Sequence, residues 1–236
     1  MAISVTPTFQ GGSKDIDQII TFHDTASPQI FYQEMNVPFA ITLLTCRPQE
    51  KNKIIISNLS PDNQYNYAVS TSLKGRSADS MHQHNHFEFM YIVNGSLYQI
   101  VEGKRFYYIP GSCCLLNRNT LHTEEYTTDF TCIFFSVSID FVSRLTNYGH
   151  FLLFEKEQTP SDNLIFHFLE NNIEETHENT KDFLDFVPRI SETQQKIMVH
   201  DIFEQMMKTL LTPYYGATYR LQDLFCQLID ILSDTR

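Results

Sequence analysis

Short runs of apolar and β-branched residues, separated by turn residues, occupy most of the chain between residues 30 and 138. Runs of this length that are closed by Pro, Gly, Asn and Asp predict strands. The predicted strands cover residues 30–33, 39–46, 53–58, 65–73, 82–93, 96–102, 105–108, 112–116 and 130–138. Many short strands at close spacing favour a sandwich or a barrel, so this part of the chain is predicted to be mainly β.

The strand over residues 82–93 is apolar in both alternating sets of side chains beyond Glu88. Such a strand is typical of the middle of a sheet that is covered on both faces. Asn94 and Gly95 follow it, and this dipeptide is the strongest short-range signal for a two-residue hairpin. The sequence therefore predicts that strand 96–102 returns antiparallel to strand 82–93.

Beyond residue 139 the apolar residues recur at helical spacing. Helices are predicted over 140–145, over 162–175 with a cap at Ser161, and from a capping box at Ser191 up to a proline. A second long helix follows a Tyr-Tyr-Gly link, and the short link makes the two helices an antiparallel pair. The narrow apolar stripe of this last helix is the predicted dimerisation surface, with Leu221, Leu224, Phe225, Leu228 and Leu232 as candidates.

The composition adds limits on partners and location. The 236 residues are 42% hydrophobic and 19% charged, as in an ordinary soluble globular protein, and no apolar run is long enough to span a membrane. The N-terminus lacks the features of a secretory signal, so the chain is expected in the cytoplasm. With 17 basic and 28 acidic residues, a net charge of -11 and no basic run, this chain alone is expected to bind DNA poorly.

The five cysteines show no Cys-x-x-Cys spacing, which favours reduced, packed thiols over a disulfide framework or a cysteine zinc site.

One polar constellation interrupts the apolar pattern. His82, His84 and Glu88 are spaced so that, on one strand with a two-residue repeat, all three side chains leave the same face. His122 is the candidate fourth member from a neighbouring strand. Imidazoles and a carboxylate are a ligand set that a first-row divalent metal accepts. His86 has the same parity, but it is interpreted as a residue at the mouth of the pocket and left out of the set.

These residues resemble the motifs of the cupin superfamily. The first motif is matched throughout by His82-x-His84, three residues, Glu88, six residues and Gly95. The second motif is matched in spacing but not in all residues, since both of its turn residues are replaced by Asn and Tyr126 stands where the pattern has Asn. The second-motif positions are Gly111, Asn117, Asn119 and His122.

The fuller resemblance is to the N-terminal sensing domain of AraC-type bacterial transcription regulators. It rests on the stretch from His82 to Gly95, on the segment from Pro110 to His122 and on the Tyr-Tyr-Gly helix pair, and it covers about residues 30–236. The resemblance implies a cupin-like double-stranded β-helix, or jelly-roll barrel, followed by helices. Two helix-turn-helix units follow in the family, and the residues after Gly216 leave no room for them.

The expected organisation therefore has three parts. Residues 1–29 form an N-terminal arm, residues 30–155 the cupin-like effector-sensing barrel, and residues 156–236 a helical dimerisation and linker segment. The DNA-binding helix-turn-helix domain is expected to be absent from this chain.

By this resemblance the chain is a homodimeric, non-enzymatic sensor of a small-molecule effector, a sugar among the candidates, with no required cofactor and no membrane partner. In this reading His82, His84, Glu88 and His122 form the polar floor of the effector pocket, and the chain would contact DNA only through the absent domain. The alternative is a metal-dependent cupin enzyme, an oxygenase or isomerase, in which His82, His84, Glu88 and His122 hold iron or manganese. A storage or structural cupin, with neither effector nor metal, is a third reading.

Overall fold

A computed structural model describes residues 23–24, 31–49, 53–61, 64–70, 81–125, 127–148, 163–174, 183–186 and 193–233. Within these residues the strands form two sheets. The six-stranded sheet has the order β1 (His23–Asp24), β2 (Phe31–Gln33), β6 (His82–His84), β11 (His122–Glu125), β8 (Leu97–Val101) and β9 (Lys104–Tyr108). The seven-stranded sheet has the order β13 (Phe183–Phe186), β10 (Cys113–Leu116), β7 (Phe87–Gly95), β12 (Phe130–Val137), β3 (Phe39–Arg47), β4 (Lys53–Leu59) and β5 (Gln64–Ser70).

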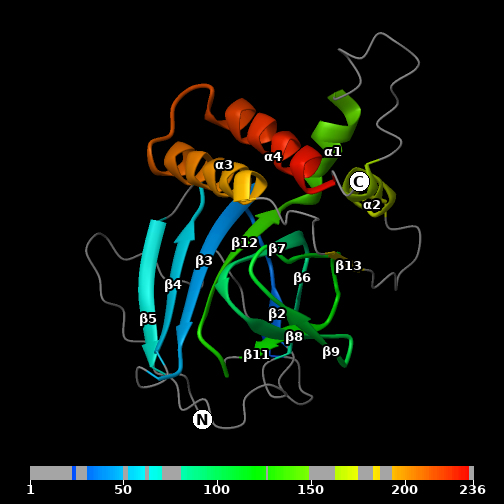
Figure 1. Cartoon of the computed structure of the whole chain (residues 1–236). Coiled ribbons are helices and arrows are strands. Elements are labelled where there is room, and N and C mark those ends of the chain that lie inside the picture. Colours follow the sequence, from blue (N-terminus) through cyan, green and yellow to red (C-terminus); the bar gives the residue numbers. More distant parts are fainter. Residues whose placement is uncertain are drawn as a thin grey trace.

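The two sheets face each other and form a cupin-like jelly-roll barrel, and the helices lie outside it (Figure 1). The described helices are α1 (Ile139–Tyr148), α2 (Leu164–Asn171), α3 (Thr193–Leu211) and α4 (Ala217–Ser233). Helices α3 and α4 pack against each other as a hairpin at one side of the seven-stranded sheet (Figure 1). The predicted fold class, a mainly β jelly roll followed by a helical segment with an antiparallel helix pair, is confirmed.

The position of strand β7 between two cores explains why its sequence is apolar on both faces. Phe87, Phe89 and Tyr91 belong to a core cluster that the seven-stranded sheet shares with the four helices. Met90 and Ile92, from the alternate set, belong to a second cluster inside the barrel, between the two sheets. Because successive strand residues point to opposite faces, β7 contributes to both cores at once.

The predicted hairpin at Asn94–Gly95 is wrong. β7 lies between β10 and β12, whereas β8 lies between β11 and β9 in the other sheet. At Gly95, whose φ is 74°, the chain crosses from one sheet to the other, and the Ser96 N–H donates to the Asp129 carbonyl at 3.3 Å. The hairpin that does form joins β8 to β9 through Glu102 and Gly103, whose φ values of 48° and 76° match a type I′ turn.

The prediction that both motif histidines and Glu88 share one strand is also wrong. A bend at Asn85–His86 separates β6 from β7, and the two strands belong to different sheets. Two contacts to a distant segment hold this bend: the Asn85 N–H donates to the Gln33 carbonyl at 3.3 Å, and the Met35 N–H donates to Asn85 Oδ1 at 2.9 Å. The sequence looks continuous because the partners of the bend lie far away in the chain.

Helix α2 begins later than predicted. Asn163 is its N-cap, and Asn163 Oδ1 accepts the Phe166 N–H at 2.9 Å. The predicted caps at Ser161 and Ser191 lie outside the described residues. Strand β13 was not predicted; its four residues pair antiparallel with β10 at the sheet edge.

The five candidate dimerisation residues lie in the chain's own core. Leu221, Leu224, Phe225, Leu228 and Leu232 are all buried and belong to the cluster between the helices and the seven-stranded sheet. In this arrangement a partner cannot contact this stripe without unpacking α4. Dimerisation itself stays a prediction.

The three-part division of the chain also stays a prediction, because most of residues 1–29 and the boundary at 155–156 lie outside the described residues. The five thiols are free; four are buried, and Cys226 is exposed on α4. Among the described residues, no helix is both long enough and apolar enough to cross a membrane.

Candidate functional site

The structure brings the four predicted site residues together at one end of the barrel interior. His122 on β11 lies opposite His82 on β6 in the sheet register, and their ring centroids are 4.0 Å apart. His84 also approaches His122, with ring centroids 5.0 Å apart. Glu88 reaches the group from β7 in the facing sheet. His84 and His122 are 0% exposed and Glu88 is 7% exposed, so the cluster is an interior feature.

Backbone carbonyls orient the two fully buried imidazoles. His84 Nδ1 lies 2.7 Å from the His86 carbonyl oxygen, and His122 Nδ1 lies 2.9 Å from the Thr120 carbonyl oxygen. A carbonyl oxygen only accepts, so both Nδ1 atoms carry the proton that is donated. The Nε2 atoms of both rings are therefore the ones left to face the interior of the site.

Three atoms converge without a directed hydrogen bond. Glu88 Oε1 lies 3.3 Å from His122 Nε2 and 3.9 Å from His84 Nε2. These are charge contacts, since none of the three buried atoms has a hydrogen-bond partner of good geometry. Buried polar atoms are normally hydrogen-bonded. Two imidazole nitrogens and a carboxylate oxygen that converge in this way fit a divalent metal ion, which would satisfy all three.

The electrostatics of the cluster favour a charged Glu88. Burial alone would raise the pKa of this carboxyl, but its contact with His122 and the neighbouring imidazole charges outweigh burial and hold the pKa below its usual range. Burial alone would lower the pKa of His122, yet the contact with Glu88 raises it. Burial and the neighbouring His86 lower the pKa of His84. Glu88 and His122 thus form the charge-paired part of the cluster, and His84 stays neutral.

His86 was wrongly interpreted as a residue at the pocket mouth. It is 5% exposed, its ring stacks on that of His84 with centroids 4.2 Å apart, and its Nδ1 lies 3.2 Å from Asn85 Oδ1. Burial lowers the pKa of His86 to about 4. His86 lies in the bend between β6 and β7 and not in a strand, so strand parity does not account for its buried position.

Glu124 was missed altogether. It follows His122 by two positions on β11, so the two side chains share one face of the strand. Glu124 is 4% exposed, and its Oε1 accepts a hydrogen bond from Gln99 Nε2 at 3.2 Å. Burial raises the pKa of this carboxyl. The two-residue spacing from His122 was visible in the sequence.

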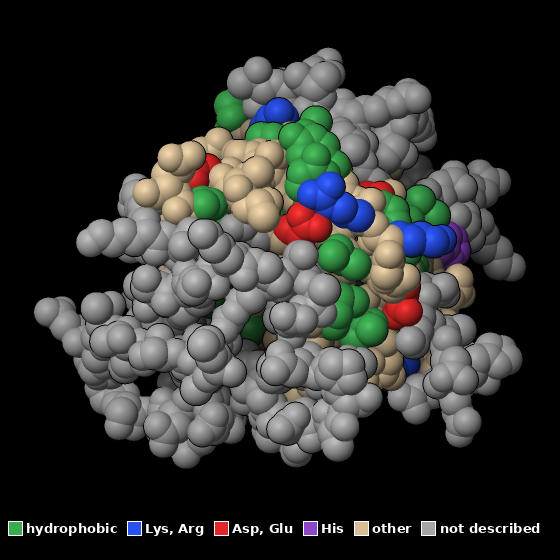
Figure 2. Space-filling model, turned by 90° about the horizontal axis from the view of Figure 1, so that it is seen from below, with side chains coloured by type: hydrophobic (Ala, Val, Ile, Leu, Met, Phe, Trp, Pro, Cys, Tyr) green, Lys and Arg blue, Asp and Glu red, His purple; other side chains and the backbone are tan. Residues whose placement is uncertain are grey.

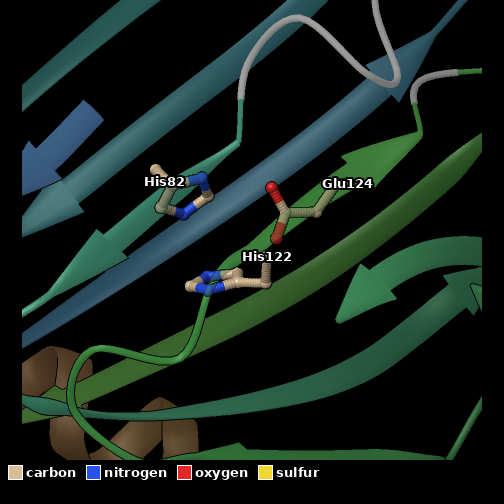
Figure 3. Close-up of side chains that lie close together, drawn as sticks. All are labelled: His82, His122 and Glu124. Carbon is tan, nitrogen blue, oxygen red and sulfur yellow. The ribbon is translucent and has the colours of Figure 1, made fainter. Parts of the chain in front are cut away.

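The possible ligand atoms fall into groups that differ from the predicted set. His82, His122 and Glu124 form one group within which all ligand atoms lie within 4.8 Å of one another (Figure 3). His84, His86 and Glu88 form a second group by the same measure. Both are interior groups. A third group, centred on His200 in α3, is exposed to solvent.

On the underside of the molecule, the described residues that can be seen form no cluster comparable with the buried histidines and carboxylates. In this view acidic, basic and apolar side chains are mixed, with no large patch of one kind of charge (Figure 2).

Comparison with solved structures finds matches at low identity and with TM-scores below 0.5. A variant of ToxT from Vibrio cholerae is 11% identical, with a TM-score of 0.43, and the match covers 83% of this chain and 55% of that one. The AraC-like transcriptional activator CuxR is 9% identical, with a TM-score of 0.35, and the match covers 79% of this chain and 55% of that one. The EutQ protein of Clostridium difficile is 12% identical, with a TM-score of 0.25, and the match covers 44% of this chain and 66% of that one.

This chain thus spans about half the length of the ToxT and CuxR chains. A search among curated proteins finds no match. Residues 67–227 match the sequence model of the AraC-like ligand binding domain, and this range contains the buried cluster and most of the helix pair. The chain therefore belongs to the family of AraC-like ligand binding domains.

Proposed function

We propose that the chain is the effector-sensing and dimerisation module of an AraC-type transcription regulator and controls a helix-turn-helix domain that lies outside these residues. The family match supports the sensing role. The observation that carries the proposal is the buried polar cluster, since a jelly roll built only for stability would fill this interior with apolar side chains.

A sensor also needs a connection from its ligand to the rest of the protein. The loop over residues 117–120 touches the cluster twice: the Asn119 N–H donates to the His84 carbonyl at 2.9 Å, and the Thr120 carbonyl holds His122. Asn119 has a φ of 58°, so the loop has a specific conformation that a ligand can favour or disfavour. A ligand that moves either histidine therefore acts on this loop.

The same loop is bonded to the end of helix α2. Asn117 Nδ2 donates to Asn172 Oδ1 at 2.7 Å, and Arg118 Nη2 donates to the Asn172 carbonyl at 2.8 Å and to the Ile173 carbonyl at 3.2 Å. The Asn117–Asn172 contact is buried, where a broken hydrogen bond costs more than at the surface. A change in the loop would therefore be transmitted to α2.

The other end of α2 is bonded to the last turn of α4. Ser233 Oγ lies 2.7 Å from Asn163 Oδ1, the atom that also caps α2. A contiguous set of contacts thus links the cluster, loop 117–120, α2 and the end of α4. An effector with different affinities for two arrangements of these parts would shift their populations.

For the dimerisation half of the proposal, the helix pair offers a surface that is separate from the buried stripe. Large apolar and aromatic side chains are exposed around the link between the helices: Leu211, Tyr214, Tyr215 and Tyr219. Exposed apolar groups that lie together are typical of interaction sites. We expect a second copy of the chain to pack here.

Hydrogen exchange tests the sensing role. Small molecules, sugars first, are screened by the rise in melting temperature that a bound ligand produces. A sensor is expected to show slower amide exchange in loop 117–120, α2 and α4 when the selected ligand binds. A ligand that binds the barrel and leaves exchange in α2 and α4 unchanged would contradict the proposal. Sedimentation at high concentration tests dimerisation, and a strict monomer would remove that half.

A metal-dependent cupin enzyme is the second candidate, because His84 Nε2, His122 Nε2 and Glu88 Oε1 converge without hydrogen bonds. A bound metal with open positions would act as a Lewis acid or activate oxygen, and these residues would hold it. Stoichiometric metal that is lost in His84→Ala, together with oxygen uptake or isomerisation of a substrate, would favour the enzyme. Metal without turnover would leave the sensor as the better description.

A further inference from the structure

We propose that a divalent transition-metal ion binds in the barrel on His82, His122 and Glu124, a set that differs from the cupin motif because Glu124 supplies the carboxylate. The chemical class is a first-row ion that accepts two imidazoles and one carboxylate, such as Zn²⁺, Ni²⁺, Fe²⁺ or Mn²⁺. The ion would be a ligand of the proposed sensor. A regulatory role of the ion rests on that proposed function, whereas its binding does not.

The three side chains share one rigid platform. His122 and His82 are directly paired in the antiparallel register of β11 and β6. Glu124 lies two residues beyond His122 on β11, and in Figure 3 its carboxylate lies beside both imidazole rings. All three come from the six-stranded sheet. A site that stands on paired strands holds its geometry better than one assembled from loops.

Neighbouring groups orient the ligands as metal sites require. The Thr120 carbonyl accepts a hydrogen bond from the Nδ1–H of His122; this residue is 0% exposed, and its Nε2 lies 3.3 Å from Glu88 Oε1 without a hydrogen bond of good geometry. Gln99, which lies opposite Glu124 in the register of β8 and β11, donates to the Glu124 carboxylate at 3.2 Å. Such outer contacts fix the ring tautomer and the direction of the carboxylate.

The spacing suits one ion. The three ligand atoms lie within 4.8 Å of one another. Ligands bound at about 2.0–2.2 Å from a common ion lie no more than about 4.4 Å apart. Small side-chain adjustments therefore close the site around an ion.

Glu88, the carboxylate of the motif, belongs to a different group. It reaches the cluster from the facing sheet. Its carboxylate oxygen and the ligand atoms of His84 and His86 lie within 4.8 Å of one another. Glu88 also lies 3.3 Å from His122 Nε2, so it supplies a negative charge next to the site. An experiment can therefore decide whether Glu124 or Glu88 supplies the carboxylate that binds the ion.

The test is titration calorimetry of the full chain, stripped with chelator, with Zn²⁺ and with Ni²⁺. All variants carry His200→Ala, because the exposed group His200, Asp201 and Glu204 is a second place where ions can collect. We expect one ion per chain, and Glu124→Gln should weaken binding at least about 100-fold, since it removes a ligand rather than an outer contact. Glu88→Gln should weaken binding by less than about 10-fold.

Glu125→Gln is the matched control. Glu125 is adjacent on β11, faces the other side of the strand and binds Arg105 at 2.8 Å, so this change should leave ion affinity unchanged. His82→Asn is the second ligand variant; His82 is only partly buried, and its replacement is expected to lower affinity while the chain stays folded by circular dichroism.

Two results would overturn the inference: no ion bound by the His200→Ala chain, or binding that Glu88→Gln abolishes and Glu124→Gln retains. Failure of the sensor proposal looks different, because α2 and α4 would then fail to respond in hydrogen exchange whether or not an ion is bound.

Discussion

The two cores of this molecule use the same strands for different purposes. The core between the seven-stranded sheet and the helices is built from apolar and aromatic side chains, with ring pairs such as Phe135–Phe225 at 5.3 Å and Tyr91–Phe203 at 5.7 Å. The core inside the barrel combines apolar side chains of β8 and β9 with buried polar side chains: Gln99 on β8, and histidines and carboxylates on β6, β7 and β11. Along a single strand, stability and chemistry therefore alternate from one residue to the next.

The two cores differ in the free-energy cost of the groups that they bury. Burying polar groups is unfavourable unless each one has a partner, and three buried atoms of His84, Glu88 and His122 lack directed hydrogen bonds. The helix-facing core has no such penalty. We infer that the helix-facing core supplies most of the stability that lets the barrel interior keep a polar site.

The largest effect is expected from Phe89→Ala in β7. Phe89 is buried in the helix-facing core, so the change should lower the free energy of unfolding by about 3–5 kcal/mol, measured by urea denaturation. Ion binding in the barrel should persist under conditions where the variant is folded. Simultaneous loss of binding in the folded protein would show that the two cores are not independent.

A smaller effect is expected from Gly95→Ala, at the crossover between the sheets. A Cβ here would come within 2.0 Å of the Asp129 carbonyl, and φ is 74°, so we expect a loss of about 2–4 kcal/mol in thermal unfolding. Gly103→Ala is the control, because Gly103 has a φ of 76° and open space around the added Cβ. It should lose only about 1–2 kcal/mol. Equal losses would mean that backbone conformation alone, and not the contact with Asp129, makes Gly95 necessary.

Asn172→Ala tests the connection between barrel and helices. The change removes the acceptor of the buried Asn117 amide and should cost about 1–3 kcal/mol in denaturant unfolding. It should also speed amide exchange in α2 more than in β7. The exposed neighbour Asn171→Ala serves as the control and should have little effect. An unchanged exchange pattern in Asn172→Ala would argue against coupling through this contact.

The smallest expected effect concerns the rate at which one thiol is alkylated, with no change in the free energy of unfolding. Partial burial of the thiol group and the negative charges of Asp230 and Asp223 raise the pKa of Cys226 to about 11. The residue as a whole is nevertheless exposed, unlike the other four cysteines. Since the thiolate is the reactive form, alkylation of Cys226 should be slow at neutral pH and rise with pH toward about 11. Mass spectrometry should find one label on the native chain and none on Cys226→Ser. Early labelling of a barrel cysteine would mean that the barrel core opens readily.

The sequence predicts the parts of this fold that depend on local pattern. The apolar run of β7 and the helix pair follow from periodicity, and the buried positions of His84, Glu88 and His122 follow from motif spacing, although His84 and Glu88 do not share a strand. Glu124 carried a parity signal, because it follows His122 by two positions on β11, whereas His86 lies in the bend between β6 and β7. Strand alternation therefore identifies Glu124 but not His86.

Sheet partners were less accessible to sequence analysis. Asn94–Gly95 has ideal hairpin chemistry, but β7 is apolar on both faces and pairs with β10 and β12 instead. The bend at Asn85 depends on contacts to the Gln33 and Met35 backbone, about fifty positions away. Interactions between distant segments overrode the local preference in both places.

Strand β13 has a consequence for how this protein can be divided. Its residues Phe183–Phe186 cover the outer edge of β10, whose four side chains, Cys113 to Leu116, are all buried. A barrel cut off near residue 155 would present that strand as an open, apolar edge, which is a template for joining other chains. Such a fragment is expected to aggregate, so the part that looks like a detachable tail in the sequence is what keeps the barrel from polymerising.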